Sequence, residues 1–192
     1  MSPTGPVPPE LDDLDFTKPL EPEPPKKAGV SPKELQALQR EIKIGTGELG
    51  ATGYYVSFTR KRPQGRKSRT GQARIVCCED DPPTLKALEK LLGLSGYQVV
   101  TAGSGKELAA VLRTPPLPDA ILLDVGLPDA NGFDIVRRLR AVEAFKTVPI
   151  VMFTGHGETE DIMRGLILGV DGYITKPATL EALSSTLESV LG

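Results

Sequence analysis

Carboxylates stand at the ends of apolar runs in this sequence, where they could carry out chemistry. The run Ala120–Leu123 is unbroken, ends in Asp124, and is followed at once by turn-forming residues between positions 126 and 132. Such a run is expected of a strand buried on both faces of a parallel sheet. Asp124 should therefore lie at the carboxyl edge of that sheet, where open α/β sheets bind ligands. It could act as a nucleophile, a metal ligand, or both.

Other predicted strand ends carry groups that complement this carboxylate. They are Glu79-Asp80-Asp81, Thr154-Gly155-His156 and Thr175-Lys176-Pro177. Carboxylates crowded at one edge repel each other unless a cation joins them, and oxygen-only ligands favour Mg²⁺ or a similar hard ion over zinc. Lys176 offers a countercharge and Thr154 a neutral hydrogen-bond donor. Together these groups are what phosphoryl transfer onto a carboxylate requires.

The elements that position these groups form a regular alternation from Arg74 onward. Five strands are predicted over residues 74–79, 97–101, 120–124, 148–153 and 172–175. Apolar residues at helical spacing follow each strand and predict five helices. Residues 74–192 are therefore predicted to form an α/β domain with a doubly wound, five-stranded parallel sheet. Right-handed crossovers would bring every strand's carboxyl end to one edge.

Residues 1–73 form a separate N-terminal extension with a different composition. Met1–Pro32 is rich in proline and acids, with too few large apolar residues to offset the ordering entropy, so we expect the extension to be mostly disordered. A proline-rich docking peptide is the alternative. Ser31 and Pro32 suit a helix start, and the spacing of the following apolar residues predicts a short helix over 33–44. The β-prone stretch Tyr54–Thr59 has no evident partner strand.

The charge of the chain is divided unevenly. Residues 1–74 hold 13 basic and 9 acidic residues, and residues 75–192 hold 10 basic and 16 acidic. The net charge of −2 is therefore the sum of +4 in the first part and −6 in the second. Seven bases and no acid lie within residues 60–74. This stretch could bind nucleic acid or an acidic partner, with a solvated basic linker as the alternative. It contains no nucleic-acid recognition motif.

Several features predict a cytoplasmic protein that does not enter a membrane. The N-terminus lacks a basic start followed by an apolar stretch, so it is no secretory signal. No apolar run approaches the ~18 residues of a membrane span. Cys77 and Cys78 are neighbours on a predicted strand and point to opposite faces. They fit small core residues of a reducing compartment better than a disulfide or a metal site.

The motifs at the strand ends resemble those of the receiver domain of two-component response regulators. The resemblance covers about Arg74–Gly192 and implies a flavodoxin-like fold with strand order 2-1-3-4-5. It rests on Glu79-Asp80-Asp81-Pro82, Leu123-Asp124-Val-Gly-Leu-Pro128 with Asn131-Gly132, Phe153-Thr154-Gly155, and Tyr173-Ile-Thr-Lys176-Pro177.

The resemblance implies that Asp124 accepts a phosphoryl group from a phosphohistidine on a sensor histidine kinase or a histidine phosphotransfer protein. Asp80 would bind Mg²⁺ (or Mn²⁺) directly, and Glu79 would hold it largely through water. Asp124 itself and the backbone carbonyl of Gly126 would complete the protein's ligands. The protein would not be an enzyme, beyond slow self-catalysed phosphoryl transfer and dephosphorylation.

The remaining matched residues would act on the phosphoryl group or report its presence. Lys176 would pair with the phosphoryl oxygens, and Thr154 would bond to them after phosphorylation. Tyr173 would be the aromatic side chain that swings inward as the surface switches. The Lys176–Pro177 peptide would be cis, which is accessible because X–Pro bonds lose most of the trans preference.

Two positions depart from the family pattern. Glu79 stands where Asp is commoner, which fits a water-mediated role, and Gly155 stands where Ala is usual, which leaves access to Asp124 open. His156 and Gly126 occupy positions where family members tune dephosphorylation. His156 could orient an attacking water, with an exposed loop histidine as the alternative. Because His156 is the only histidine, the chain is no histidine kinase or phosphohistidine carrier.

The predicted output of the protein is contact with a downstream protein target. The chain ends at its last predicted helix, so we expect no C-terminal effector domain. Met163 and Ile167 lie beside the core-facing stripe of their helix, and the 158–192 face could serve a partner or a homodimer.

Three other functions compete with this one. A receiver whose basic residues 60–74 bind nucleic acid is the main alternative. A haloacid-dehalogenase-type phosphatase would need a second acid two residues after Asp124, where this chain has Gly126. A scaffold that is never phosphorylated is disfavoured because Asp80, Asp124, Thr154 and Lys176 are all present.

Overall fold

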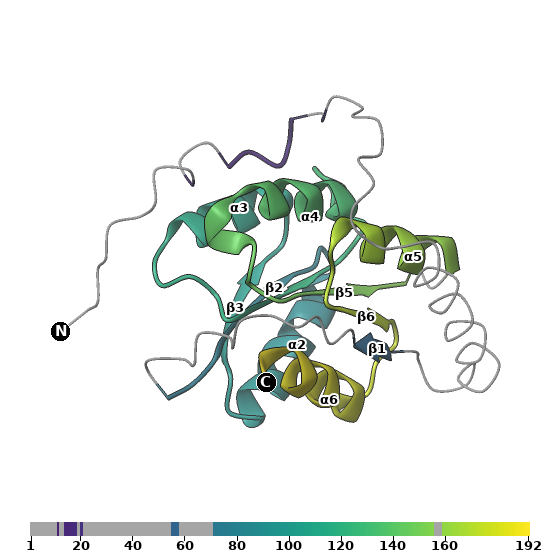
Figure 1. The fold of residues 1–192 in the computed structure, drawn as a ribbon. Helices are drawn as coiled ribbons and strands as arrows, with labels where there is room; N and C mark the ends of the chain where they lie inside the picture. Colours follow the sequence, from purple (N-terminus) through teal and green to yellow (C-terminus); the bar gives the residue numbers. More distant parts are fainter. Residues whose placement is uncertain (1–10, 12–13, 19, 21–54, 58–70, 156–158) are drawn as a thin grey trace.

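The computed structural model describes Leu11, Leu20 and residues 14–18, 55–57, 71–155 and 159–192. These residues form one sheet with helices on both faces (Figure 1). The helix predicted over 33–44, most of the basic stretch 60–74 and His156 lie outside the described residues. Among the residues described, no helix is long and apolar enough to cross a membrane.

The sheet has six strands in the order β1-β6-β5-β4-β2-β3. The five strands from β2 to β6 pair in parallel, so the predicted parallel sheet in the order 2-1-3-4-5 is confirmed when the count starts at β2. The strand bounds are β1 Tyr55–Ser57, β2 Arg74–Cys78, β3 Gln98–Ala102, β4 Ala120–Leu123, β5 Ile150–Thr154 and β6 Gly172–Thr175.

The first strand comes from the N-terminal extension. β1 pairs antiparallel with β6, and Val56 lies opposite Tyr173. The partner that the sequence did not reveal for this β-prone stretch is thus the edge strand of the parallel sheet. An edge strand exposes a row of unpaired backbone N–H and C=O groups, and β1 supplies partners for them.

Five helices of the described part of the chain cover the sheet, as predicted, and they divide between its two faces (Figure 1). Buried residues of α3, α4 and α5 share one core cluster, and those of α2 and α6 share the other. Strands β2, β4 and β5 are buried along their whole length between these layers, which explains their unbroken apolar sequences. The helix bounds are α2 Pro82–Leu94, α3 Gly105–Arg113, α4 Gly132–Ala141, α5 Thr159–Leu168 and α6 Leu180–Leu191, with a 3₁₀ turn η2 Glu143–Phe145.

Side-chain caps set where the helices begin, and thereby how much chain is left at the strand ends. Asp81 caps α2 by accepting a hydrogen bond from the Thr84 N–H at 2.9 Å. Asn131 caps α4 by accepting from the Phe133 N–H at 2.9 Å. Only Glu79 and Asp80 separate β2 from the first cap. Their side chains are therefore held at the carboxyl edge of the sheet.

Arg74, the last residue of the basic stretch, is part of the sheet and not of a basic surface. Its side chain is buried at the start of β2, and its guanidinium donates to the Pro116 carbonyl. Its backbone N–H donates to Asp119 at 2.7 Å. Burial lowers the pKa of Arg74 from its ordinary value.

A buried ion pair lies at the amino ends of β5 and β6, at the end of the sheet opposite the acidic strand ends. Arg140 lies 2.9 Å from the Asp171 carboxylate, which also accepts the Ile150 N–H at the start of β5. The guanidinium further donates to the carbonyls of Phe145 and Val148, at 2.6 and 2.9 Å. The two side chains are only 14% and 4% exposed, so removing one would leave the other charge buried without its main counterion.

We expect Arg140→Ala to lower the free energy of unfolding by about 3–5 kcal/mol, because Asp171 then stays buried without its cation. Urea unfolding at neutral pH measures the change. Lys146→Ala is the matched control, because Lys146 and Glu143 form an exposed pair with side chains 51% and 74% accessible. That variant should change stability by less than about 1 kcal/mol. Similar losses in the two variants would contradict the assignment.

Candidate functional site

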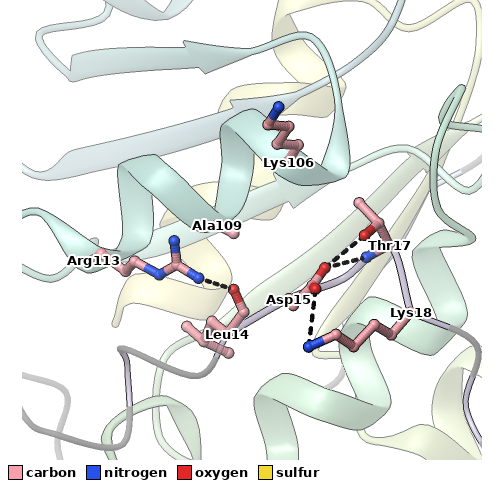
Figure 2. A pocket seen from close by; sticks show the side chains of 7 residues that line it. All are labelled: Leu14, Asp15, Thr17, Lys18, Lys106, Ala109 and Arg113. Carbon is pink, nitrogen blue, oxygen red and sulfur yellow. Dashed lines mark hydrogen bonds and ion pairs between the residues drawn. The ribbon is translucent and has the colours of Figure 1, made fainter.

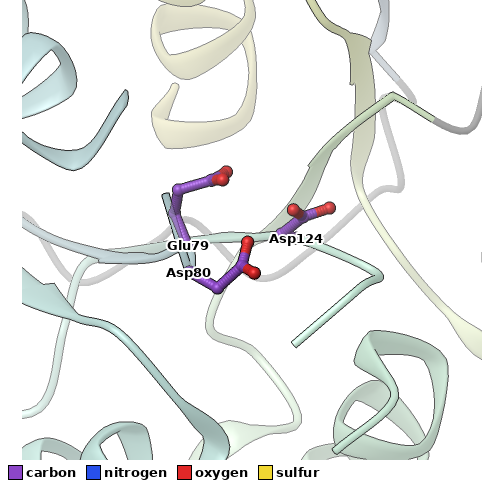
Figure 3. A group of neighbouring side chains, drawn as sticks. All are labelled: Glu79, Asp80 and Asp124. Atoms are coloured by element: carbon purple, nitrogen blue, oxygen red, sulfur yellow. The ribbon is translucent and has the colours of Figure 1, made fainter. Parts of the chain in front are cut away.

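Three carboxylates gather where β2 and β4 end. Glu79 and Asp80 follow β2, Asp124 follows β4, and one carboxylate oxygen from each lies within 4.8 Å of the others (Figure 3). Backbone hydrogen bonds continue the sheet ladder into the site: the Glu79 N–H donates to Ala102 O at 3.0 Å, and the Asp124 N–H donates to Cys78 O at 2.9 Å. The acids are therefore held by the sheet itself.

The Asp124 carboxylate is buried and bonded through both of its oxygens. Oδ1 accepts the N–H of Val125 at 2.6 Å and that of Gly126 at 3.4 Å. Oδ2 accepts from Lys176 Nζ at 2.7 Å. The loop after β4 and the lysine after β6 thus fix the orientation of this carboxylate.

Lys176 bridges two of the three acids. Its ammonium forms an ion pair with Glu79 as well as with Asp124. Burial raises the pKa of the Glu79 carboxyl above its ordinary value, and the hydrogen bond from Lys176 opposes that rise. Burial acts against the charged form of Lys176, but its hydrogen bonds to Asp124 and Glu79 outweigh burial and raise its pKa. Lys176 therefore holds the Glu79 and Asp124 carboxyl groups close to one another.

The donor set fits a hard dication. The side chains that meet here offer carboxylate oxygens, and Lys176 is the cation that pairs with two of the three acids among the described residues. A divalent ion would balance the remaining negative charge, and oxygen ligands are those that Mg²⁺ and Mn²⁺ prefer. Asp80 is exposed, so a bound ion could keep water ligands on that side.

The other predicted site residues lie on the two neighbouring strands. Thr154 is the buried last residue of β5, and it lies opposite Thr175 at the end of β6. The Lys176 N–H donates to the Thr154 carbonyl at 2.9 Å. The Lys176–Pro177 peptide is cis.

Tyr173 lies on β6, three residues before Lys176. Its side chain is fully buried in the core cluster that β6 shares with α3, α4 and α5. Burial raises the pKa of its phenol, and the nearby charges of Asp161 and Asp124 act in the same direction. The phenol is therefore neutral across the physiological pH range.

Close backbone packing shapes the loop that follows Asp124. A Cβ on Gly132 would lie 2.2 Å from the Asp124 carbonyl oxygen, so only glycine fits there. The Gly132 N–H donates to Val125 O at 2.8 Å, and Gly126 forms an antiparallel bridge with Asn131. By contrast, apart from the chain neighbours, no heavy atom of the described residues lies within 4 Å of a Cβ built on Gly126 or Gly155, so both positions are open beside the site.

The structure adds Asp129 to the residues that order this loop. Its carboxylate accepts the backbone N–H groups of Gly105 and Lys106, at 2.7 and 2.9 Å, at the first turn of α3. The loop after β4 is thereby attached to a helix more than 20 residues earlier in the chain. No local pattern marks Asp129 for this role, because its partners are distant in sequence.

A family model for the response regulator receiver domain matches residues 75–188. The chain belongs to this family. The predicted recognition is therefore confirmed: residues 75–188 form a two-component receiver domain, which is a phospho-acceptor signalling module rather than an enzyme. Receiver domains accept a phosphoryl group from histidine kinases.

Curated relatives share this domain but extend beyond it. The phosphate regulon transcriptional regulatory protein PhoB of Pseudomonas aeruginosa is 35% identical over 117 residues, covering 61% of this chain and 51% of PhoB. The TorCAD operon transcriptional regulatory protein TorR of Escherichia coli O157:H7 is 38% identical over 117 residues, covering 61% of this chain and 49% of TorR. The chain thus spans about half the length of the curated relatives it matches.

Solved structures agree with the fold. The chemotaxis protein CheY4 of Vibrio cholerae superposes with a TM-score of 0.59 at 31% identity, covering 62% of this chain and 99% of CheY4. The receiver domain of a sensor histidine kinase from P. aeruginosa PAO1 superposes with a TM-score of 0.57 at 30% identity, covering 63% and 98%. That structure has a magnesium ion coordinated in its active-site cleft.

We expect Lys176→Met to destabilise the protein by about 3 kcal/mol at neutral pH, because Glu79 and Asp124 would stay buried without their cation. Glu79 already has a raised pKa, so its folded form binds a proton more tightly than its unfolded form. Its contribution to stability is therefore largest at low pH and is lost as pH rises through the folded pKa. The loss in Lys176→Met should thus be smaller near pH 5 than near pH 8.

Urea unfolding at both pH values measures this difference. Lys90→Met, which removes an exposed lysine of α2, is the control and should show little loss at either pH. The double variant Glu79→Gln/Lys176→Met should recover part of the stability. An equal loss near pH 5 and pH 8 in Lys176→Met would contradict the ion-pair assignment.

Proposed function

We propose that this protein is a phosphorylatable response regulator whose phospho-acceptor is Asp124. A sensor histidine kinase or a histidine phosphotransfer protein supplies the phosphoryl group, and the protein signals by contacting a downstream protein. One observation carries the proposal: Asp124 lies at the carboxyl edge of a central strand, within 4.8 Å of two further carboxylates and 2.7 Å from Lys176.

The transfer is a substitution at phosphorus. An Asp124 carboxylate oxygen attacks the phosphorus atom of the donor phosphohistidine, an oxygen–phosphorus bond forms, and the phosphorus–nitrogen bond breaks. The neutral imidazole leaves after taking up a proton. Glu79, Asp80, Asp124 and the Gly126 carbonyl would hold Mg²⁺, which would supply charge neutralisation at the phosphoryl oxygens.

The residues around Asp124 position and stabilise the transferred group. Lys176 already bonds to Oδ2 and shifts to the phosphoryl oxygens, where its charge opposes their repulsion. The Thr154 hydroxyl donates to the same oxygens. Tyr173 then changes its packing and alters the surface of β6. Water reaches the phosphoryl group past Gly126 and Gly155, two positions that the described residues leave open. His156 tunes this hydrolysis.

The partner surface is assigned to the face formed by residues 158–192. Ile167 of α5 and Leu180 of α6 are among the exposed large apolar residues of the described chain, at 38% and 39%, and both belong to residues 158–192. Met163, which the sequence placed on the same surface, is buried in the core instead. A partner or a second copy would therefore find Ile167 as the exposed large apolar residue of α5 and Leu180 as that of α6.

Labelling with a radioactive small phosphodonor such as acetyl phosphate tests the acceptor. We expect the wild-type protein to incorporate label only when Mg²⁺ is present, and Asp124→Asn to incorporate none. Asp134→Asn is the matched control, because Asp134 lies in the first turn of α4 and outside the acidic cluster. Wild-type protein that takes up no label, or label that survives in Asp124→Asn, would contradict the proposal.

Variants of Asp80 and Asp81 distinguish a metal ligand from the residue that caps α2. Asp80→Asn should raise the Mg²⁺ concentration at half-maximal labelling by about tenfold or more, since one charged ligand is lost. Asp81→Asn should leave that concentration unchanged, because Asp81 bonds to Thr84 of α2. An unchanged Mg²⁺ requirement in Asp80→Asn would remove Asp80 from the ligand set.

A further inference from the structure

A short N-terminal segment is docked against α3 and α4. We call it the clasp, and it consists of Leu11 and residues 14–18. Leu11, Leu14 and Phe16 are 1%, 4% and 3% exposed, and they belong to the same core cluster as the buried residues of α3 and α4. The clasp is thus part of the folded domain, although about 90 residues of chain separate it from α3.

Two arginines hold the backbone of the clasp. Arg113, the last residue of α3, donates from Nε to the Leu11 carbonyl at 3.1 Å and from Nη2 to the Leu14 carbonyl (Figure 2). Arg138 of α4 donates to the Lys18 carbonyl. The apolar side chains of the clasp pack into the core cluster that α3 and α4 share, and we call this docking site of the clasp the α3–α4 groove. Both helices bind the backbone there, which is how a groove recognises a linear peptide.

The polar face of the clasp is organised internally. Asp15 accepts the Thr17 N–H and hydroxyl at 3.0 and 2.6 Å, and it forms an ion pair with Lys18 at 3.3 Å. A cavity of about 440 Å³ remains between this turn and α3, with Lys106 and Arg113 in its lining (Figure 2). The clasp is therefore anchored by its apolar side chains and its carbonyls, and its polar side stays loosely packed.

The clasp meets the loop after Asp124 at the start of α3. A Cβ on Gly105 would lie 2.8 Å from the Ala130 Cβ and 3.4 Å from the Phe16 Cβ. Phe16, Gly105 and the loop residue Ala130 therefore pack together without space for one extra carbon. The hydrogen bonds from Gly105 and Lys106 to Asp129 attach the same loop to α3.

This packing connects Phe16 to the phospho-acceptor. Asp124 Oδ1 accepts the N–H groups at the start of the loop. Asp129, near the end of the loop, accepts the Gly105 N–H at the start of α3. Phosphorylation would convert a carboxylate oxygen into the bridging oxygen of a mixed anhydride and would add a highly charged group beside Val125 and Gly126. Those N–H groups would change acceptor, so the loop backbone would shift. Close-packed contacts cannot follow such a shift smoothly.

We propose that the α3–α4 groove is an interaction surface for a Leu-x-x-Leu-x-Phe segment, that the clasp of this chain occupies it while Asp124 is unphosphorylated, and that phosphorylation releases the clasp. This inference rests on the proposed function of Asp124 and adds an intramolecular ligand to it. Because coupling between two binding equilibria is reciprocal, the docked clasp in turn opposes phosphorylation by the same factor.

Amide hydrogen exchange of the full-length protein tests release. Beryllofluoride with Mg²⁺ serves as a stable phosphoryl analogue on Asp124. In wild-type protein, amides of residues 14–18 should exchange about tenfold faster once beryllofluoride is bound. In Phe16→Ala they should exchange fast without it. Leu94→Ala removes an apolar side chain that is 76% exposed on α2, and it should behave as wild type.

The reverse direction is measured as affinity. Phe16→Ala should reach half-saturation at a severalfold lower beryllofluoride concentration than wild type, whereas Leu94→Ala should not. Clasp exchange that stays unchanged or slows on binding, together with equal affinities in wild type and Phe16→Ala, would overturn this proposal and leave Asp124 phosphorylation standing.

Absence of phosphodonor label in wild-type protein would overturn the proposed function and the release step with it. Docking of the clasp would still be read from the difference in exchange between wild type and Phe16→Ala without beryllofluoride. The two proposals therefore fail in distinguishable ways.

Discussion

The interaction on which the site depends is the bridge from Lys176 to two buried carboxylates. Glu79 and Asp124 come from different strands, and burial penalises the charge of each. One ammonium shared between them makes it possible to bury both acids at the sheet edge. The bridge also leaves the cluster with excess negative charge once Asp80 is included. That excess is what a divalent ion can neutralise, so the structural ion pair and the proposed metal site follow from the same electrostatic imbalance.

Much of this arrangement could be predicted because it follows from local patterns. Unbroken apolar runs indicated buried parallel strands, and parallel strands bring their carboxyl ends to one edge. The position of Asp124 beside Glu79 and Asp80 follows from that geometry alone. The sequence predicted Lys176 as a countercharge in the site. That its ammonium pairs with both Glu79 and Asp124 became clear only from the structure.

The contacts that sequence reasoning missed are long-range ones. The composition of Met1–Pro32 is poor in large apolar residues on average, and averaging hid three that face one groove, at positions 11, 14 and 16. The partner of β1 is an edge strand more than 100 residues away. Asp129 likewise bonds to a distant helix start. Such pairings depend on tertiary geometry, and residue spacing within one segment carries no information about them.

The location of the clasp limits how strongly it can respond to Asp124. The described residues of the clasp form no hydrogen bond with the Asp124 carboxylate, so any influence has to pass through the loop and Gly105. A ligand shifts an equilibrium only by its difference in affinity for the two states. Coupling between sites typically amounts to about 1–3 kcal/mol. Three buried apolar side chains and a few carbonyl contacts favour docking of the clasp, and the entropy cost of ordering its chain opposes docking. Coupling of that size decides whether the clasp stays docked when these two contributions nearly cancel.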